Sequence, residues 1–167
     1  MIMKIGYLIT VKGVTADKIK AVTFSRAAAW EMKKRFEKFF PKLNVVDFST
    51  IHSLAVEITR KYFRKNKIKY RLIEGSKNQD KRHILRDIFK SIVKENITED
   101  QMEELLTYIS YIKNKLIHTD QWSDVECNIK QAHKIMAKYE AFKNNSDVLL
   151  LDYDDLLIYA NKALDDA

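Results

Sequence analysis

Residues 20–48 read KAVTFSRAAAWEMKKRFEKFFPKLNVVDF and contain two short β-prone runs separated by a helical pattern. The runs are residues 20–24 and 43–48, which are rich in the Val and Phe that strands favour. Between them, Ser25 can cap a helix that Pro41 stops. A strand, a helix and a second strand in this order form a right-handed crossover, which makes the two strands parallel.

Two strands are too few to make a stable open sheet on their own. We therefore expect this sheet to have further strands outside the 167 residues. Residues 1–12 have the pattern of a helix end, which Gly13 closes.

Beyond residue 48 the apolar residues recur at helical spacing, and several stripes follow a residue that can cap a helix. The cap candidates are Ser49 or Thr50, Thr98 with Gln101, Ser123 with Glu126, and Asp152. The sequence thus predicts a mainly α protein with a small β part. It divides into an α/β segment (1–65), a helical subdomain (66–144) and a return segment into the α/β part (145–167).

Composition narrows the class of protein. With 46% hydrophobic and 32% charged residues the chain can bury a core, and no apolar run approaches the roughly 20 residues of a membrane span. The single Cys127 suits a reducing compartment, and the first ten residues lack the pattern of a signal peptide. We therefore expect a soluble, cytoplasmic protein. None of the three glycines belongs to a P-loop or a dinucleotide-binding turn.

Charge is distributed unevenly along the chain. Residues 1–86 carry 21 Lys and Arg against 7 Asp and Glu, whereas residues 87–167 carry 9 against 16. Residues 60–71 are the most basic stretch, and Tyr62 and Tyr70 are among the aromatic residues within it. Basic groups can neutralise phosphates while aromatic rings stack on bases, so this stretch indicates nucleic-acid binding. The alternative is an ordinary solvated surface.

Three short motifs resemble those of the UvrD/Rep/PcrA-like superfamily 1 DNA helicases. Residues 21–32 (AVTFSRAAAWEM) resemble motif Ia, a strand that ends in Val-Thr-Phe-Thr-Asn-Lys-Ala-Ala and is followed by x-Glu-Met. Residues 48–54 (FSTIHSL) are similar to the family's Thr-Phe-His-Ser/Ala segment, and residues 151–157 (LDYDDLL) to its Asp-Phe-Asp-Asp-Leu-Leu segment. Residues 5–9 (IGYLI) also resemble the helix that follows the family's P-loop.

The resemblance implies an internal piece of an ATP-dependent helicase that translocates on single-stranded DNA and unwinds duplex. The piece would be part of the RecA-like motor subdomain 1A with the inserted helical subdomain 1B. The family's Walker A loop would precede Met1 and its Walker B strand would follow Ala167. ATP and magnesium are thus implied for the parent, with no cofactor in this chain. Implied partners are single-stranded and duplex DNA and the remaining helicase domains.

Other interpretations remain open. A helicase-nuclease subunit shares these motifs, and a stand-alone nucleic-acid-binding adaptor or a protein-interaction module would also suit the charge pattern. The exposed edge of a two-stranded sheet also favours self-association.

Three groups of residues are the candidate DNA contacts, and we expect no catalytic or metal-binding residue. They are Thr23, Phe24, Ser25 and Arg26; Thr50, His52 and Ser53; and Arg64, Lys65, Lys67 and Lys69. Arg26 stands where the family usually has Asn, and Ala27 where it has Lys. The simpler alternative for the first group is that Phe24 belongs to the core and Ser25 is only a cap.

The apolar run that ends in Asp152 has two interpretations. It imitates a Walker B strand, so Asp152, Asp154 and Asp155 could be metal ligands or an acid/base pair. They also open an apolar-striped helix, where carboxylates cap free amides and favour the helix dipole. We favour capping.

Overall fold

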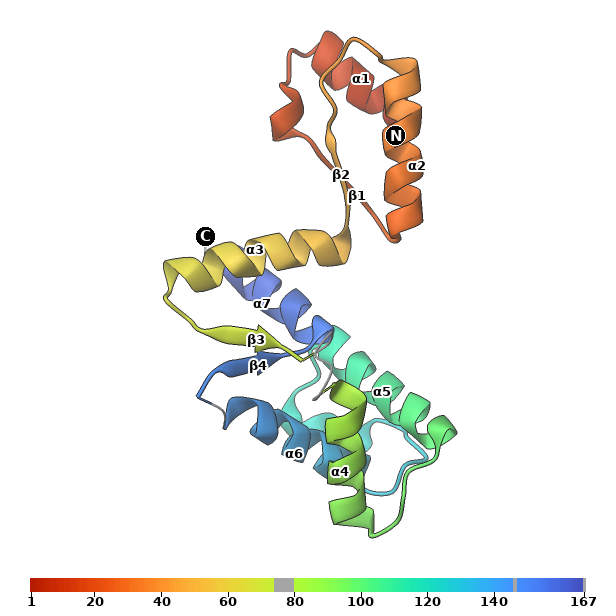
Figure 1. Ribbon diagram of the computed structural model, residues 1–167, viewed down its shortest axis with the longest axis vertical. Helices are drawn as coiled ribbons and strands as arrows, with labels where there is room; N and C mark the ends of the chain where they lie inside the picture. The colour runs from red at the N-terminus through yellow and green to blue at the C-terminus, as the bar shows by residue number, and fades with distance from the viewer. Residues whose placement is uncertain (74–79, 146, 167) are drawn as a thin grey trace. The chain divides into compact units, whose positions relative to one another are not determined.

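The computed structural model describes residues 1–73, 80–145 and 147–166 (Figure 1). The chain divides into two compact units, Met1–Glu57 and Ile58–Ala167. The described residues are mainly helical and contain two small parallel sheets, as the sequence predicted in outline. No helix among these residues has the length and apolar character needed to cross a membrane.

The first unit contains the strand-helix-strand arrangement predicted from the sequence. Its elements are α1 (Ile2–Thr10), the short 3-10 helix η1 (Ala16–Lys18), β1 (Lys20–Thr23), α2 (Arg26–Phe39), β2 (Asp47–Thr50) and the first part of α3 (Ile51–Lys65). The two strands pair in parallel, with Lys20 opposite Asp47 and Thr23 opposite Thr50. The crossover prediction is therefore confirmed.

A small core holds this unit together. Ile5, Ala21, Phe36 and Val46 are buried, and the rings of Phe40 and Phe48 pack at 5.4 and 5.8 Å from that of Phe36. Gly6 leaves room for the Phe40 ring, which a Cβ at this position would overlap. Gly13 has φ +66° just after α1, in the left-handed region that glycine adopts without strain.

The predicted bounds of the strands need correction. The second strand was predicted at residues 43–48 but runs from Asp47 to Thr50. After Pro41 the chain turns, and the amide of Leu43 donates to the carbonyl of Phe40, so the pairing begins later. The first strand ends at Thr23 rather than at Phe24.

The second unit is a helical assembly around a second parallel strand pair. It contains the end of α3, β3 (Tyr70–Leu72), α4 (Lys81–Val93), α5 (Glu99–Asn114), the 3-10 helix η2 (Thr119–Asp124), α6 (Ala132–Asn144), β4 (Leu149–Leu151) and α7 (Tyr153–Asp165). In Figure 1, α7 lies on one side of β3 and β4, and α6 lies on the other. The larger core of the chain is here, where Leu85, Met102, Leu105, Ile109 and Ile135 are fully buried.

Two sequence predictions fail in this unit. Residues 70–72 belong to the predicted helical subdomain and only two strands were expected in the chain, yet Tyr70–Leu72 pairs with Leu149–Leu151. The predicted capping box at Ser123 and Glu126 is also absent, because Ser123 lies in η2 and α6 begins only at Ala132. Four other caps are confirmed, namely Ser25, Thr50, the capping box of Thr98 and Gln101, and Asp152.

Candidate nucleic-acid interface

The parallel pairing of β1 and β2 brings the first two groups of predicted residues to one edge. Thr23 and Thr50 are opposite each other in the register and are the last residues of their strands. The turns that follow carry Phe24, Ser25 and Arg26 on one side and His52 and Ser53 on the other. Ligands of parallel α/β sheets characteristically bind outside the carboxyl ends of the strands.

The turn from β1 to α2 is fixed by short-range hydrogen bonds. The Thr23 hydroxyl donates to the Ser25 carbonyl at 3.0 Å, and Ser25 Oγ accepts from the amide of Ala28 at 3.1 Å. The ring of Phe24 is 91% exposed, so it does not belong to the core of the described first unit. Arg26 is exposed in the first turn of α2, where helix amides and the helix dipole favour an anion.

The turn from β2 to α3 has a similar construction. Thr50 is 8% exposed, and its hydroxyl oxygen accepts from the amide of Ser53 at 3.1 Å and lies 2.9 Å from Ser53 Oγ. Thr50 therefore caps α3, while His52 and Ser53 are exposed. Ile51 is also exposed, so both turns present an apolar group beside polar groups.

The third group of predicted residues lies in the second unit. Arg64 and Lys65 belong to the last turn of α3, and Lys67 and Lys69 lie between α3 and β3. All four are exposed, and within the described part of the chain none of their side chains has an acidic partner. Lys67 adopts φ +55°, so the chain turns sharply between two basic positions.

The aromatic residues of this basic stretch do not serve as the expected stacking faces. Phe63 is buried, with its ring 4.9 Å from those of Tyr70 and Tyr159, and Tyr62 donates to Asp166 at 3.0 Å. These rings pack against one another, so they do not present a face on which a base could stack. The stretch therefore offers charge without a free aromatic surface.

A buried cluster of charges at the start of α7 was not predicted. Asp152 is fully buried and Asp155 nearly so, and Lys113 lies 2.8 Å from the first carboxylate and 2.7 Å from the second. Lys143 contacts Asp155 at 2.6 Å, and Lys81 contacts Asp152 at 3.1 Å. The three lysines come from α4, α5 and α6, so the cluster joins all of these helices to α7.

The charges of Asp152 and Lys113 in this cluster support each other. Burial alone would raise the pKa of Asp152, but Lys113, Lys143 and Lys81 together hold that pKa below its ordinary value. Burial alone would lower the pKa of Lys113, and the nearby carboxylates of Asp155, Asp152 and Glu140 raise it instead. The carboxylate of Asp152 and the ammonium group of Lys113 are therefore both charged at neutral pH.

The carboxylates of residues 152 and 155 are thus used for structure. Asp152 Oδ1 accepts from the amide of Asp155 at 2.9 Å, and Asp155 Oδ2 accepts from the amide of Asp152 at 2.8 Å. This reciprocal capping confirms the interpretation favoured from the sequence. Among the described residues, no group of three or more His, Cys, Asp and Glu is arranged to hold a metal ion.

Sequence reasoning missed the lysines of the cluster, although a signal was present. Lys113 follows Ile109 and Ile112 at helical spacing, and Lys143 continues the stripe of Met136 and Tyr139. A lysine on the apolar side of a helix indicates a buried partner.

Taken together, these observations describe a mainly helical protein with small parallel sheets, in which an exposed ring and two capped helix starts lie at the ends of β1 and β2. The family model of the UvrD/REP helicase N-terminal domain matches residues 1–167. The chain belongs to this family, as the motifs indicated.

Curated relatives agree with this assignment. The chain is 32% identical over 162 residues to ATP-dependent DNA helicase Rep of Buchnera aphidicola subsp. Acyrthosiphon pisum. The matched residues cover 94% of this chain and 24% of that protein. It is 30% identical over 161 residues to ATP-dependent DNA helicase PcrA of Staphylococcus epidermidis, covering 93% of this chain and 21% of PcrA. PcrA of Staphylococcus aureus is 29% identical over the same length. The chain thus spans about a quarter or less of the length of these relatives.

Proposed function

We propose that these residues are the DNA-contacting part of an ATP-dependent DNA helicase that moves along a single strand and unwinds duplex. The relatives are ATP-dependent DNA helicases, and this chain corresponds to their N-terminal domain family. In the proposal, ATP and magnesium are bound by parts of the motor outside this sequence. ATP turnover by the 167 residues alone, with DNA and magnesium present, would contradict it.

One observation carries the proposal. The ends of β1 and β2 lie side by side and expose Phe24 and His52 beside the first turns of two helices. A ring can stack on any base, whereas hydroxyls and helix amides suit the phosphates between bases. This combination is suited to a single strand, in which bases and phosphates are both accessible.

We assign the basic group of Arg64, Lys65, Lys67 and Lys69 to phosphate contact, with duplex DNA as its partner. Within the described residues these four cations have no acidic partner, which suits a regular array of phosphates, and no ring of this stretch is among the exposed hydrophobic side chains, which argues against stacking.

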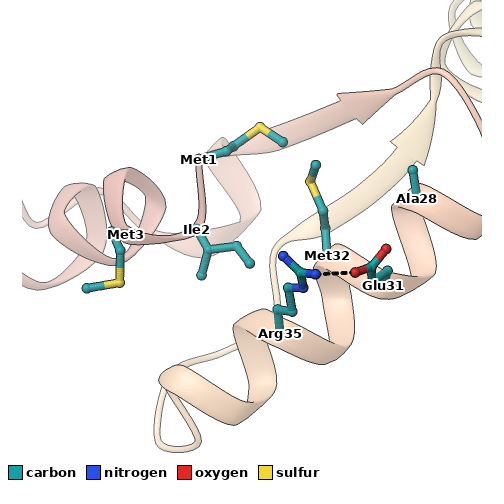
Figure 2. Close-up of a pocket in the computed structure, with 7 residues that line it drawn as sticks. All are labelled: Met1, Ile2, Met3, Ala28, Glu31, Met32 and Arg35. Atoms are coloured by element: carbon teal, nitrogen blue, oxygen red, sulfur yellow. Dashed lines mark hydrogen bonds and ion pairs between the residues drawn. The ribbon is translucent and has the colours of Figure 1, made fainter.

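The proposal includes the division into motor subdomain and helical insertion. Residues 1–65 and 145–167 would belong to a RecA-like subdomain 1A, and residues 66–144 would form subdomain 1B. An open hollow of about 370 Å³ lies between α1 and α2. Figure 2 shows the residues that line it, with Ile2 and Met32 among the apolar ones. Each strand of the β1–β2 pair also has one unpaired edge within the described residues. These open surfaces suit contact with the remaining helicase domains.

We expect a cytoplasmic location, as the sequence predicted. The same open strand edge would also allow a second copy of the chain to bind. Sedimentation over a range of concentrations tests the self-association; a monomer at all of them would exclude it.

The first experiment concerns the exposed ring. We expect Phe24→Ala to raise the Kd for a labelled oligothymidine by about 5- to 100-fold, because stacking of a base on an aromatic ring contributes about 1–3 kcal/mol. Fluorescence anisotropy with the 167-residue chain measures the change.

Phe39→Ala is the matched control. Phe39 is also exposed in the first unit, but it lies at the far end of α2 from the strand ends. Its replacement should leave the Kd unchanged. Equal losses in the two variants would mean that the oligonucleotide does not stack at the predicted site.

A further inference from the structure

The acidic half of the chain contains a groove that the DNA-binding proposal does not use. It lies in the second unit between α5 and the segment of residues 117–127, and it encloses about 480 Å³. This volume falls within the roughly 300–1,000 Å³ of ordinary ligand sites. Its floor includes Tyr108 and Val125, and Tyr111, which is 49% exposed, lies at its rim.

Hydrogen bonds fix the two walls of the groove to each other. The hydroxyl of Tyr108 donates to the carbonyl of Trp122 at 2.5 Å, and the amide of Asn128 donates to Glu104 Oε1 at 2.7 Å. The Trp122 indole N–H also donates to the carbonyl of Ile117 at 3.0 Å. Burial raises the pKa of Tyr108 to about 12, so this phenol stays a hydrogen-bond donor at neutral pH. The groove is thus formed before anything binds.

The charge of the groove has one sign. Glu104, Asp124 and Glu126 line it, and no lysine or arginine does. Among the described residues none of these three carboxylates has a cationic partner, although the chain carries 30 lysines and arginines. Like charges that converge without compensation favour a cation from outside the chain.

From this combination we propose that the groove binds a basic peptide segment of a partner protein. An apolar side chain of the segment enters between Tyr108 and Val125. Its lysine or arginine side chains contact Asp124 and Glu126, and one of them lies over the exposed Tyr111 ring in a cation–π contact. Nucleic acid is excluded as the occupant because its phosphates would meet these carboxylates.

Anisotropy with three labelled octapeptides tests the groove. One alternates arginine with leucine, the second alternates aspartate with leucine, and the third alternates arginine with serine. We expect the arginine-leucine peptide to bind most tightly, because only it supplies both cations and apolar side chains. Equal binding of the arginine-serine peptide would mean diffuse charge attraction, and tighter binding of the aspartate-leucine peptide would reverse the predicted sign; either result would overturn the proposal.

Variants then locate the site. Asp124→Asn combined with Glu126→Gln should weaken binding of the arginine-leucine peptide by about 3- to 10-fold, since each exposed ion pair contributes up to about 1 kcal/mol. Tyr111→Ala should also weaken it. All three residues are exposed, so the variants should fold, which circular dichroism verifies.

Glu95→Gln is the matched control, because Glu95 is exposed and does not line the groove. It should leave peptide binding unchanged, and an equal loss in this control would overturn the proposal. A dimer that forms in sedimentation and is lost in the double variant would place a second copy in the groove and would likewise overturn it. Oligothymidine binding should be the same in all variants, so failure here is distinguishable from failure of the DNA-binding proposal.

Discussion

At the scale of single residues, the two most informative positions have the opposite exposure from the one their residue types favour. Phe24 is apolar and almost fully exposed, whereas Lys113 is charged and almost fully buried. An exposed ring leaves hydrophobic stabilisation unused, and a buried charge requires compensation. The DNA-binding proposal would explain the first, and three carboxylates around the Lys113 ammonium group explain the second.

Lys113→Met should therefore destabilise the second unit strongly. The variant removes one of the cations that Asp152, Asp155 and Glu140 share and leaves Lys143 and Lys81 to compensate three carboxylates; breaking a buried ion pair on one side costs about 3–5 kcal/mol. Urea unfolding measures the free energy of unfolding. Lys115→Met, at an exposed position two residues away, should change it by less than about 0.5 kcal/mol. Similar losses in both variants would show that the cluster adds no stability.

The pH dependence of stability in the unmodified chain and in Lys113→Met shows whether the charge of Lys113 stabilises the fold. Because the folded chain raises the pKa of Lys113 above its ordinary 10.5, the stabilisation is fully present below pH 10.5 and is lost as the pH rises through the folded pKa. The unfolding free energy of the unmodified chain should thus fall above pH 10.5 more steeply than that of Lys113→Met. Parallel curves over this range would assign the effect of the substitution to packing alone.

At the scale of elements, local signals in the sequence predicted helix starts well and failed where a contact comes from far along the chain. Ser25 and Asp152 cap helices as expected, because a cap bonds only to an amide two or three residues away. The β3–β4 pair was missed, since each strand has three residues and the partner of Tyr70 is Leu149.

The same reasoning explains how much of the candidate site was predictable. The juxtaposition of Thr23 and Thr50 follows from the handedness of the crossover, so the first two groups could be placed together in advance. The inward rings of Phe63 and Tyr70 could not be predicted, because their contacts with each other and with Tyr159 arise only from the packing of β3 and α7 on α3.

Two predicted capping boxes allow a direct comparison. Thr98 and Ser123 each precede a Gln or Glu by three residues, but only Thr98 makes the reciprocal bonds, with Gln101 at 3.0 and 3.2 Å. Thr98→Ala should therefore lower the free energy of unfolding by about 1 kcal/mol. Ser123→Ala should change it by less than about 0.5 kcal/mol, because Ser123 Oγ bonds only the exposed Asp124. Thermal unfolding of the two variants would contradict the assignment if Ser123→Ala were the more damaging.

At the scale of the whole molecule, the net charge of +7 conceals a basic first half and an acidic second half. The basic first half contains all eleven proposed DNA contacts, whereas the acidic second half contains the groove between α5 and residues 117–127. Under the two proposals, long-range attraction would act on DNA through the first half of the sequence and on a basic partner through the second half. The salt dependence of DNA binding should reflect the first half alone.

Replacing Lys65, Lys67 and Lys69 together with glutamine tests this division. Each phosphate contact contributes about 0.9 to the slope of log K against log salt for duplex DNA, so losing three should make the slope less steep by up to about 2.7. The matched triple Lys90→Gln, Lys94→Gln and Lys130→Gln removes the same charge from exposed positions that all lie outside the basic first half. Binding of a labelled duplex from low to high salt distinguishes local contact from net charge. If both triples flatten the slope equally, the overall charge attracts DNA and the basic segment has no special contact with the phosphates.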